Sequence, residues 1–285
     1  MTVRRSLRAL LAEGGCIAAP GACDAFTARI IERAGFSAIY LGGNAIGLSL
    51  AKGQPFVTLT ETVACTANVV RAVDAAVVVD AGAGFGEPAH VLGAVRELEA
   101  AGASALHIDD QPYPKQPAYH RGRGGLAAID TAAARIAAAR SARRNPDTML
   151  IARTDAMRVA RSTEEVIARG RAFAEAGAEA LLTLDLAPEQ ASPVKAALPD
   201  LPLIWIGGVT APIPAFDCIA AAGFAMALYP FNTVAAIASA VSDLWQGLRA
   251  SGEIAQSPDL LTRMRGETLD IVDMTSAWRI EDASR

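Results

Sequence analysis

Short apolar runs that alternate with alanine-rich segments of helical period recur eight times along the chain, and this alternation limits the fold more than any other feature. Continuous apolar runs between amphipathic helices are typical of strands that are buried on both faces of a parallel sheet. Eight strand–helix units predict an α/β fold, the (β/α)8 or TIM barrel, while a doubly wound open sheet remains the alternative. The predicted strands are Cys16–Ala19, Ala38–Leu41, Ala76–Val79, Ala105–Ile108, Met149–Ala152, Ala180–Leu184, Leu203–Ile206 and Ala225–Leu228.

A weak internal repeat supports the barrel. Ala-Gly tetrads at 34–37, 101–104, 176–179 and 222–225 each close a predicted helix and lead into an even-numbered strand. Glycine is favoured there because the residue that follows a helix often needs a left-handed conformation. A length of 285 residues suits one barrel domain over 1–285 that ends in additional C-terminal helices at about 255–285.

Composition excludes several classes of protein. The chain has 52% hydrophobic and 20% charged residues, which excludes intrinsic disorder, and a net charge of -4 gives no basic footprint for nucleic acid. There is no apolar run of about 18 residues and no signal-peptide core, so we expect no membrane segment and a cytoplasmic location. Cys16, Cys23, Cys65 and Cys218 are scattered, which favours neither disulfides nor structural zinc.

Polar residues collect where the predicted strands end, and in a barrel the active site lies at this edge. Carboxylates, an arginine and glycine amides together predict a site for a small anionic substrate, with a hard metal ion bound through oxygen. The Gly207-Gly208 turn is also similar to the turns with which many barrels bind phosphate. The strand ends carry Gly42-Gly43-Asn44, Asp80, Asp109-Asp110, Arg153-Thr154-Asp155, Asp185, Gly207-Gly208 and Tyr229.

A series of motifs over about residues 6–273 resembles the isocitrate lyase/phosphoenolpyruvate mutase superfamily. The most specific is Ile151–Ala156, which reads IARTDA. The others are PGACDAFTAR at 20–29, GFSAIY at 35–40, Asp80 with GFG at 84–86, HIDDQ at 107–111, YP at 229–230 and MRGETL at 264–269. The resemblance implies a (β/α)8 barrel that is usually tetrameric and exchanges a C-terminal helix between subunits. We therefore expect a homo-oligomer, either a tetramer or a dimer.

The resemblance also implies a chemistry. Members of the superfamily make or break C–C or C–P bonds beside a 2-oxo acid, through an enolate-like species that Mg²⁺ stabilises. By position, Arg153 and the Gly42-Gly43 amides would bind a substrate carboxylate, with Asn44, Asp80 and Tyr229 as further substrate-binding candidates. The remaining roles fall on Asp80 and Asp109 as metal ligands, Tyr40 as an aid to proton transfer, and Lys115 in the loop that closes over the substrate.

The chain departs from the superfamily at three places. Gly82 stands where a second acidic residue is usual, and Lys52–Phe56 contains no counterpart of a loop aspartate, so we expect weaker Mg²⁺ binding. The loop Lys115–His120 lacks both the catalytic cysteine of the lyases and the Asn-Ser pair of the C–P enzymes. Tyr119 or His120 could carry the proton instead, and we count His120 among the catalytic candidates.

Neighbouring residues divide between structure and site. Asp109 and Asp110 are adjacent, so their side chains should face opposite ways, and the resemblance assigns Asp109 to the site. Asp155 is expected to orient Arg153 or to cap the next helix. His107 is expected to be a core histidine.

These observations lead to one hypothesis with two alternatives. The chain is predicted to be a carbon–carbon lyase or decarboxylase that acts on a small 2-hydroxy or 2-oxo carboxylic acid through a metal-stabilised enolate. The first alternative is a C–P enzyme of the phosphonomutase or phosphonopyruvate hydrolase kind. The second is a divergent barrel that binds a dicarboxylate without turnover.

Overall fold

The computed structural model describes residues 6–207 and 212–285, and each of the eight predicted strands is present to within two residues at either end. The third, fourth and fifth strands extend beyond the prediction and end at the polar residues Asp80, Asp109 and Thr154. Backbone pairing continues into this region, where Asp109 lies opposite Arg153. The strands are β1 (Ile17–Pro20), β2 (Ala38–Leu41), β3 (Ala76–Asp80), β4 (Ala105–Asp109), β5 (Met149–Thr154), β6 (Ala180–Leu184), β7 (Leu203–Ile206) and β8 (Met226–Tyr229).

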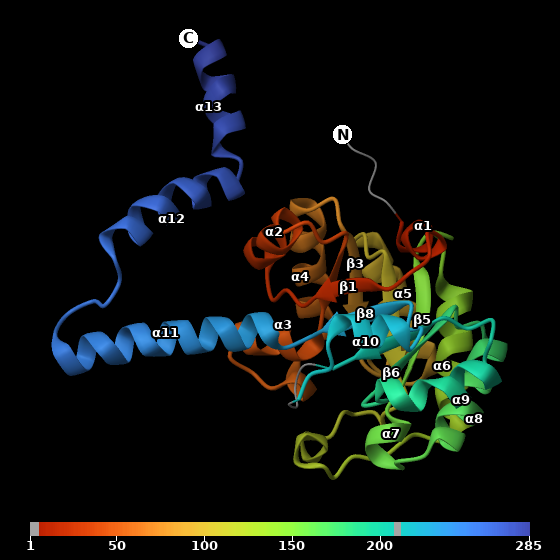
Figure 1. Cartoon of the computed structure of the whole chain (residues 1–285). Helices are drawn as coiled ribbons and strands as arrows, with labels where there is room; N and C mark the ends of the chain where they lie inside the picture. The colour runs from red at the N-terminus through yellow and green to blue at the C-terminus, as the bar shows by residue number, and fades with distance from the viewer. Residues whose placement is uncertain (1–5, 208–211) are drawn as a thin grey trace. The chain divides into compact units, whose positions relative to one another are not determined.

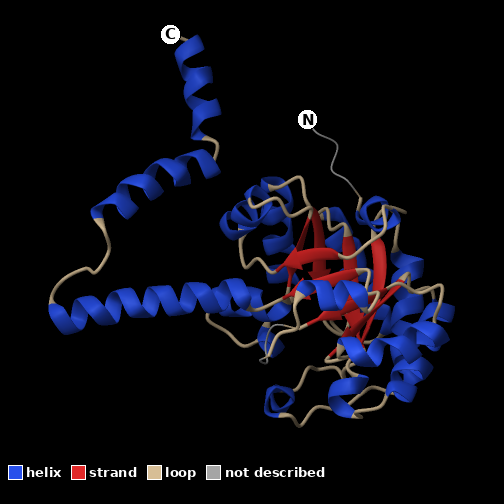
Figure 2. Cartoon of the chain, in the orientation of Figure 1, coloured by secondary structure: helices blue, strands red, loops and turns tan. Residues whose placement is uncertain are grey.

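All eight strands are parallel and form one sheet in the order β1-β8-β7-β6-β5-β4-β3-β2. The two end strands meet through a parallel bridge between Gly21 and Tyr40. The amide of Ala22 also donates a hydrogen bond to the carbonyl oxygen of Tyr40 at 2.9 Å. The sheet is therefore closed into the predicted (β/α)8 barrel, and the open sheet is excluded (Figure 2).

Helices connect the strands and surround the barrel (Figure 1). Local signals place their ends: the Asp24 side chain accepts a hydrogen bond from the amide of Thr27 at the start of one helix, and Gly177, at a φ of 106°, ends another. The helices of this part are α1 (Leu7–Ala12), α2 (Ala25–Arg33), α3 (Gly43–Ser49), α4 (Leu59–Ala72), α5 (Pro88–Ala100), α6 (Ile129–Ala142), α7 (Ala156–Val159), α8 (Thr163–Ala176), α9 (Ala191–Ala197) and α10 (Phe216–Ala221), with 3₁₀ turns at Gln54–Phe56, Pro117–Arg121 and Pro188–Gln190.

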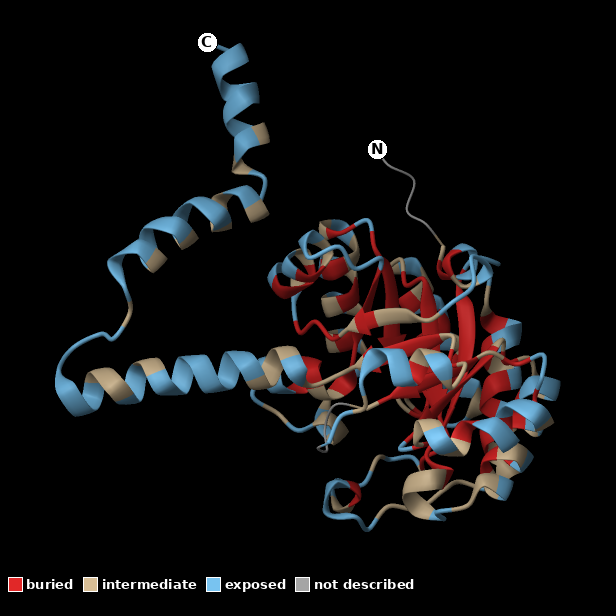
Figure 3. Cartoon of the chain, viewed as in Figure 1, coloured by how far each residue is buried: buried red, intermediate tan, exposed pale blue. Residues whose placement is uncertain are grey.

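Alternate residues of each strand enter two different apolar clusters, as the period of a strand requires. Ile39 and Leu41 pack in the layer beneath the helices, whereas Ala38 and Tyr40 belong to the cluster that fills the barrel. Leu7 of α1 belongs to this inner cluster and is fully buried. Figure 3 shows the strands as the buried centre of this part of the chain. Burial on both faces explains why the strands read as unbroken apolar runs.

The structure divides into two compact units, Met1–Asn232 and Thr233–Arg285. The second unit consists of α11 (Asn232–Ser251, whose first residue belongs to the barrel unit), α12 (Pro258–Ile271) and α13 (Met274–Ala283), and it includes the predicted C-terminal helices. No helix within the described residues has both the length and the apolar character that crossing a bilayer requires.

Candidate active site

A cavity of about 300 Å³ opens at the carboxyl ends of the barrel strands. Eight of the candidates named from the sequence line it together, which brings an arginine, a carboxylate, phenols and an imidazole around one space. The eight are Tyr40, Gly42, Asn44, Asp80, Tyr119, His120, Arg153 and Gly207. Because they come from separate strands and loops, only closure of the barrel assembles them.

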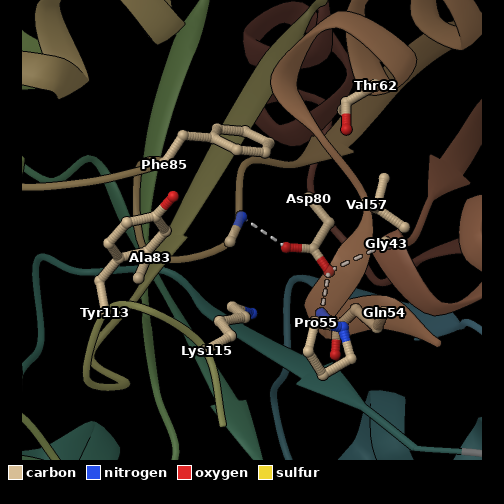
Figure 4. Close-up of a pocket in the computed structure, with 11 residues that line it drawn as sticks. Gly43, Gln54, Pro55, Val57, Thr62, Asp80, Ala83, Phe85, Tyr113 and Lys115 are labelled. Carbon is tan, nitrogen blue, oxygen red and sulfur yellow. Dashed lines mark hydrogen bonds between the residues drawn. The ribbon is translucent and has the colours of Figure 1, made fainter. Parts of the chain in front are cut away.

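A smaller cavity of about 60 Å³ lies beside the first, and Asp80 and Gln54 line both. Gly43 and Lys115 are part of this second lining (Figure 4). Most of the predicted site residues thus line one of two adjacent spaces that share the Asp80 carboxylate, whereas Asp109 and Tyr229 line neither.

Arg153 is held from behind by Asp155. Its Nε and Nη2 donate to the two oxygens of Asp155 at 2.8 and 3.2 Å. Asp155 also accepts hydrogen bonds from the side-chain amide of Gln111 at 2.6 Å and from the Tyr119 hydroxyl. Burial alone raises the pKa of Asp155, but the Arg153 charge and these hydrogen bonds outweigh it and lower that pKa. The guanidinium, 7% exposed, is therefore fixed in a geometry suited to a carboxylate.

Asp80 ends β3 and accepts backbone hydrogen bonds on both of its oxygens. The amide of Gly82 donates to Oδ1 at 2.8 Å and the amide of Gly43 to Oδ2 at 3.0 Å, and Gln54 Nε2 lies 3.4 Å from Oδ2. Burial raises the pKa of this carboxyl, but the electrostatic influence of His107, Lys115 and Arg153 holds it well below its ordinary value. Asp80 is therefore an ionised group on the wall of the cavity.

The adjacent aspartates at the end of β4 face different partners. Asp109 accepts hydrogen bonds from Lys115 Nζ at 2.5 Å and from the amide of Gln111 at 3.2 Å. Asp110 points to the other side, where it accepts from Thr154 Oγ1 at 2.7 Å and from Arg169 Nη1 at 3.2 Å. The two side chains thus face opposite ways, as the strand period requires.

Tyr40 and His107 form a buried pair inside the barrel mouth. The Tyr40 hydroxyl lies 2.9 Å from His107 Nε2, and the two rings are stacked at 5.6 Å. Burial lowers the pKa of His107 to about 4, so the imidazole is neutral near pH 7. Burial, followed by the Asp80 charge, raises the pKa of Tyr40 well above its ordinary value. Tyr40 is therefore a protonated hydroxyl, which can donate into the cavity when the His107 proton is on Nε2.

The donor set of Asp80 and Asp109 does not fit a divalent cation well. A hard ion such as Mg²⁺ takes six oxygen ligands, several of them waters, and is held by carboxylates that face it. Here every carboxylate oxygen of the two aspartates already accepts a hydrogen bond, one of them from an ammonium group. No group of three or more His, Cys, Asp or Glu side chains that could hold a metal ion occurs in residues 6–207 and 212–285.

Two of the sequence-based candidates lie differently from what their roles require, and the placement of a third is not described. The Tyr229 ring packs edge-on against Trp205 at 5.7 Å, and the residues that follow, Pro230 and Phe231, line the large cavity instead. The Gly43 amide is engaged by Asp80 at 3.0 Å rather than open to a substrate carboxylate. Gly208 lies outside the described residues.

Two polar residues that line the large cavity were not singled out from the sequence as site residues. Gln54 begins the 3₁₀ turn that follows α3, and its side chain lies against Asp80, in the segment where the superfamily pattern leads one to expect an aspartate. Arg158 lies on α7, with its guanidinium 5.8 Å from the centre of the Tyr119 ring, and Asp185 holds it at 2.6 Å. A second arginine so soon after the IARTDA motif was the available signal.

Residues 7–248 match the family described as phosphoenolpyruvate phosphomutase. The chain belongs to the phosphoenolpyruvate mutase/isocitrate lyase superfamily.

Relatives in this superfamily are similar over nearly the whole chain. The 2,3-dimethylmalate lyase of Eubacterium barkeri is 34% identical, covering 99% of this chain and 98% of its own length. The 2-methylisocitrate lyase of Aeropyrum pernix is 36% identical, covering 93% of this chain and 86% of its own length. A solved oxaloacetate acetylhydrolase with 3,3-difluorooxalacetate superimposes with a TM-score of 0.90 at 26% identity, over 99% of this chain and 97% of that one.

Other relatives are named as decarboxylases or as an enzyme that acts on a phosphonate. They include oxaloacetate decarboxylases and a phosphonopyruvate hydrolase whose solved structure holds oxalate and Mg²⁺. That structure superimposes with a TM-score of 0.81 at 26% identity, over 94% of this chain and 96% of that one. The superfamily thus contains C–C lyases, decarboxylases and C–P enzymes on the same barrel.

Proposed function

We propose that this protein is a carbon–carbon lyase or decarboxylase that acts on a small 2-hydroxy or 2-oxo carboxylic acid. The observation that carries the proposal is Arg153, a buried guanidinium that Asp155 holds on the lining of the large cavity. The substrate class comes from the relatives, whose names specify 2,3-dimethylmalate, 2-methylisocitrate and oxaloacetate.

The site suits a reaction that develops negative charge beside a bound carboxylate. Arg153 would bind and orient the substrate carboxylate, and the neutral Tyr40 hydroxyl would donate a hydrogen bond toward the charge. The Mg²⁺ that the superfamily implies would supply a Lewis acid for the same charge, with Asp80 and Asp109 as its ligands. Since their oxygens are already engaged, no step is assigned to the metal.

The test is the release of a 2-oxo acid from four compounds: 2-methylisocitrate, 2,3-dimethylmalate, oxaloacetate and phosphonopyruvate. We expect turnover of at least one of the first three compounds. A coupled dehydrogenase that reduces the released oxo acid measures it. Turnover of phosphonopyruvate alone would replace the proposal with the C–P alternative. Calorimetric binding of oxalate without turnover of any compound would support the binding-only barrel and contradict the proposal.

We propose His120 as the group that moves the proton. It lines the large cavity, and burial together with the Lys115 and Arg158 charges lowers its pKa, which keeps the imidazole neutral and able to accept a proton. Tyr119 is less suited, because burial and the Asp155 charge raise its pKa and its hydroxyl already donates to Asp155.

Replacing His120 with asparagine should therefore lower kcat by about 100-fold or more while KM changes little. Tyr119→Phe should mainly raise KM, because it loosens the carboxylate that holds Arg153. Steady-state kinetics on the active compound of the panel measures both. An unchanged kcat in the His120 variant would remove this role.

We also propose that the chain acts as a homo-oligomer, a dimer or a tetramer. None of the residues of α11, α12 and α13 is buried, and apolar side chains such as Trp245, Leu261 and Ile280 are exposed on them. A second copy is the partner that this surface predicts. Sedimentation velocity of the whole chain would show a single monomeric species if the proposal is wrong. A cytoplasmic location stays a prediction of the sequence.

A further inference from the structure

Two buried carboxylates lie on neighbouring strands at the mouth of the barrel. Asp80 is 4% exposed and Asp109 1% exposed, at the ends of neighbouring strands β3 and β4. Buried negative charges of this kind need a cation or hydrogen-bond donors close by. The cation beside Asp109 is Lys115, whose side chain is 10% exposed and whose ammonium lies 2.5 Å from Asp109 Oδ2.

The same ammonium occupies the space beside Gly82. A Cβ atom added at Gly82 would lie 3.2 Å from Lys115 Cε and 3.6 Å from Nζ. The Gly82 amide in turn donates to Asp80 at 2.8 Å, so the ammonium lies next to the loop that binds Asp80. A carboxylate side chain at 82, which the superfamily pattern leads one to expect, would meet Lys115. The Lys115 ammonium therefore occupies the space that a carboxylate at 82 would take.

The charge balance differs from that of a metal site. A divalent ion between Asp80 and Asp109 would lie close to the ammonium, and like charges a few ångströms apart in a buried place repel strongly. The ammonium also lies on the lining of the small cavity that shares Asp80 and Gln54 with the large one (Figure 4). A positive charge that needs no metal is thus already present on the wall of the small cavity, which adjoins the cavity that Arg153 lines.

We propose that the Lys115 ammonium takes the place of the divalent cation, so that this protein stabilises the reacting oxyanion without a metal. The proposal rests on the function proposed above.

In decarboxylation, the bond between C3 and the departing carboxyl carbon breaks, its electron pair forms the enolate on the C2 oxygen, carbon dioxide leaves and a proton adds to C3. In cleavage of a 2-hydroxy acid, the C2 hydroxyl loses its proton and becomes the carbonyl of the 2-oxo product. The broken bond's electron pair passes to the other fragment, whose carbon is then protonated. In both, Lys115 donates a hydrogen bond to the charged oxygen at C2.

Metal binding tests the proposal without any substrate. Titration of the whole chain with Mn²⁺ alone, followed by electron paramagnetic resonance of the free ion, should show no site filled below about 1 mM, the weak end of carboxylate sites. The double variant Gly82→Asp with Lys115→Met should gain a site in that range. A wild-type site filled well below 1 mM would overturn the proposal whether or not the function above is correct.

Turnover supplies the second readout. Activity on the responding compound should persist in excess EDTA, and Lys115→Met should lower kcat by about 100-fold or more with a smaller change in KM. Lys115→Arg keeps the charge and should restore part of kcat, which a merely structural lysine would not predict. The matched control is Lys195→Met, an exposed lysine on α9 that should leave kcat unchanged. Activity abolished by EDTA and restored by Mg²⁺ would overturn the proposal.

Discussion

Replacing Arg153 with methionine is expected to lower kcat/KM by about 1,000-fold. Among the residues that line the large cavity, Arg153 is the arginine that lies on a strand and is oriented by a buried carboxylate. Its guanidinium donates hydrogen bonds of 2.8 and 3.2 Å to Asp155. A hydrogen bond to a charged group contributes about 1.5–3 kcal/mol, and two of them to a substrate carboxylate give about 4 kcal/mol. Each 1.4 kcal/mol or so is a factor of ten in rate.

Calorimetry with oxalate measures the same loss without turnover, since a dicarboxylate needs the same guanidinium. Arg153→Lys should recover only part of the affinity, because an ammonium cannot offer the planar fork. The variant must be shown to be folded, since it leaves Asp155 buried without its cation. Oxalate affinity and kcat/KM that both equal the wild-type values in a folded Met variant would contradict the assignment of Arg153 to the substrate carboxylate.

Replacing Arg169 with methionine is expected to cost about 3–5 kcal/mol of the free energy of unfolding. Arg169, 5% exposed on α8, donates to the fully buried Asp110 at 3.2 Å and to the Ala127 carbonyl at 3.0 Å. Asp110 in turn accepts from the amide of Asp155 at 3.0 Å. Loss of the cation leaves this carboxylate uncompensated beneath the site, and the loop that carries Asp155 loses its support.

The free energy of unfolding that is lost when Arg169 is replaced should depend on pH. Burial, followed by the Asp155 charge, raises the pKa of Asp110 from 3.8 to about 6, so the stability linked to its protonated form is lost as the pH rises from about 4 to 6. Removing Arg169 raises this pKa further and extends the loss to higher pH. Urea unfolding should therefore show a larger difference from the wild type at pH 8 than at pH 5.

Arg171→Met is the matched control for Arg169. Arg171 lies exposed on the same helix, so its replacement should change stability by no more than about 0.5 kcal/mol at either pH. Equal costs for the two arginine variants would show that Asp110 does not depend on Arg169.

The barrel was predictable from the sequence, and so was the edge at which the large cavity opens. Eight apolar runs bounded by helical segments are a local pattern, and a parallel barrel is the closed arrangement that buries both faces of such strands. Asp80, Asp109 and Arg153 were found because each lies where an apolar run ends. The exact strand ends differed, since β3, β4 and β5 continue into these polar residues.

The hydrogen bonds and ion pairs between these polar residues were harder to predict from the sequence. Asp155 was expected to orient Arg153, two residues away, because neighbours in the chain are constrained to be near each other. Nothing local indicates that Arg169 reaches Asp110 across 59 positions, or that Gln54 stands against Asp80. Such contacts depend on the path of whole helices and loops.

The sequence by itself determined which residues stand at the mouth of the barrel, because strand period and strand ends are set by a few neighbouring side chains. Only the tertiary structure decided what those residues do to one another. The loop after β4 turns back so that the Lys115 ammonium lies on Asp109 and against Gly82, and the Gly43 amide is bonded to Asp80. Charge compensation acts over a few ångströms in space, and that distance is fixed by closure of the barrel rather than by spacing along the chain.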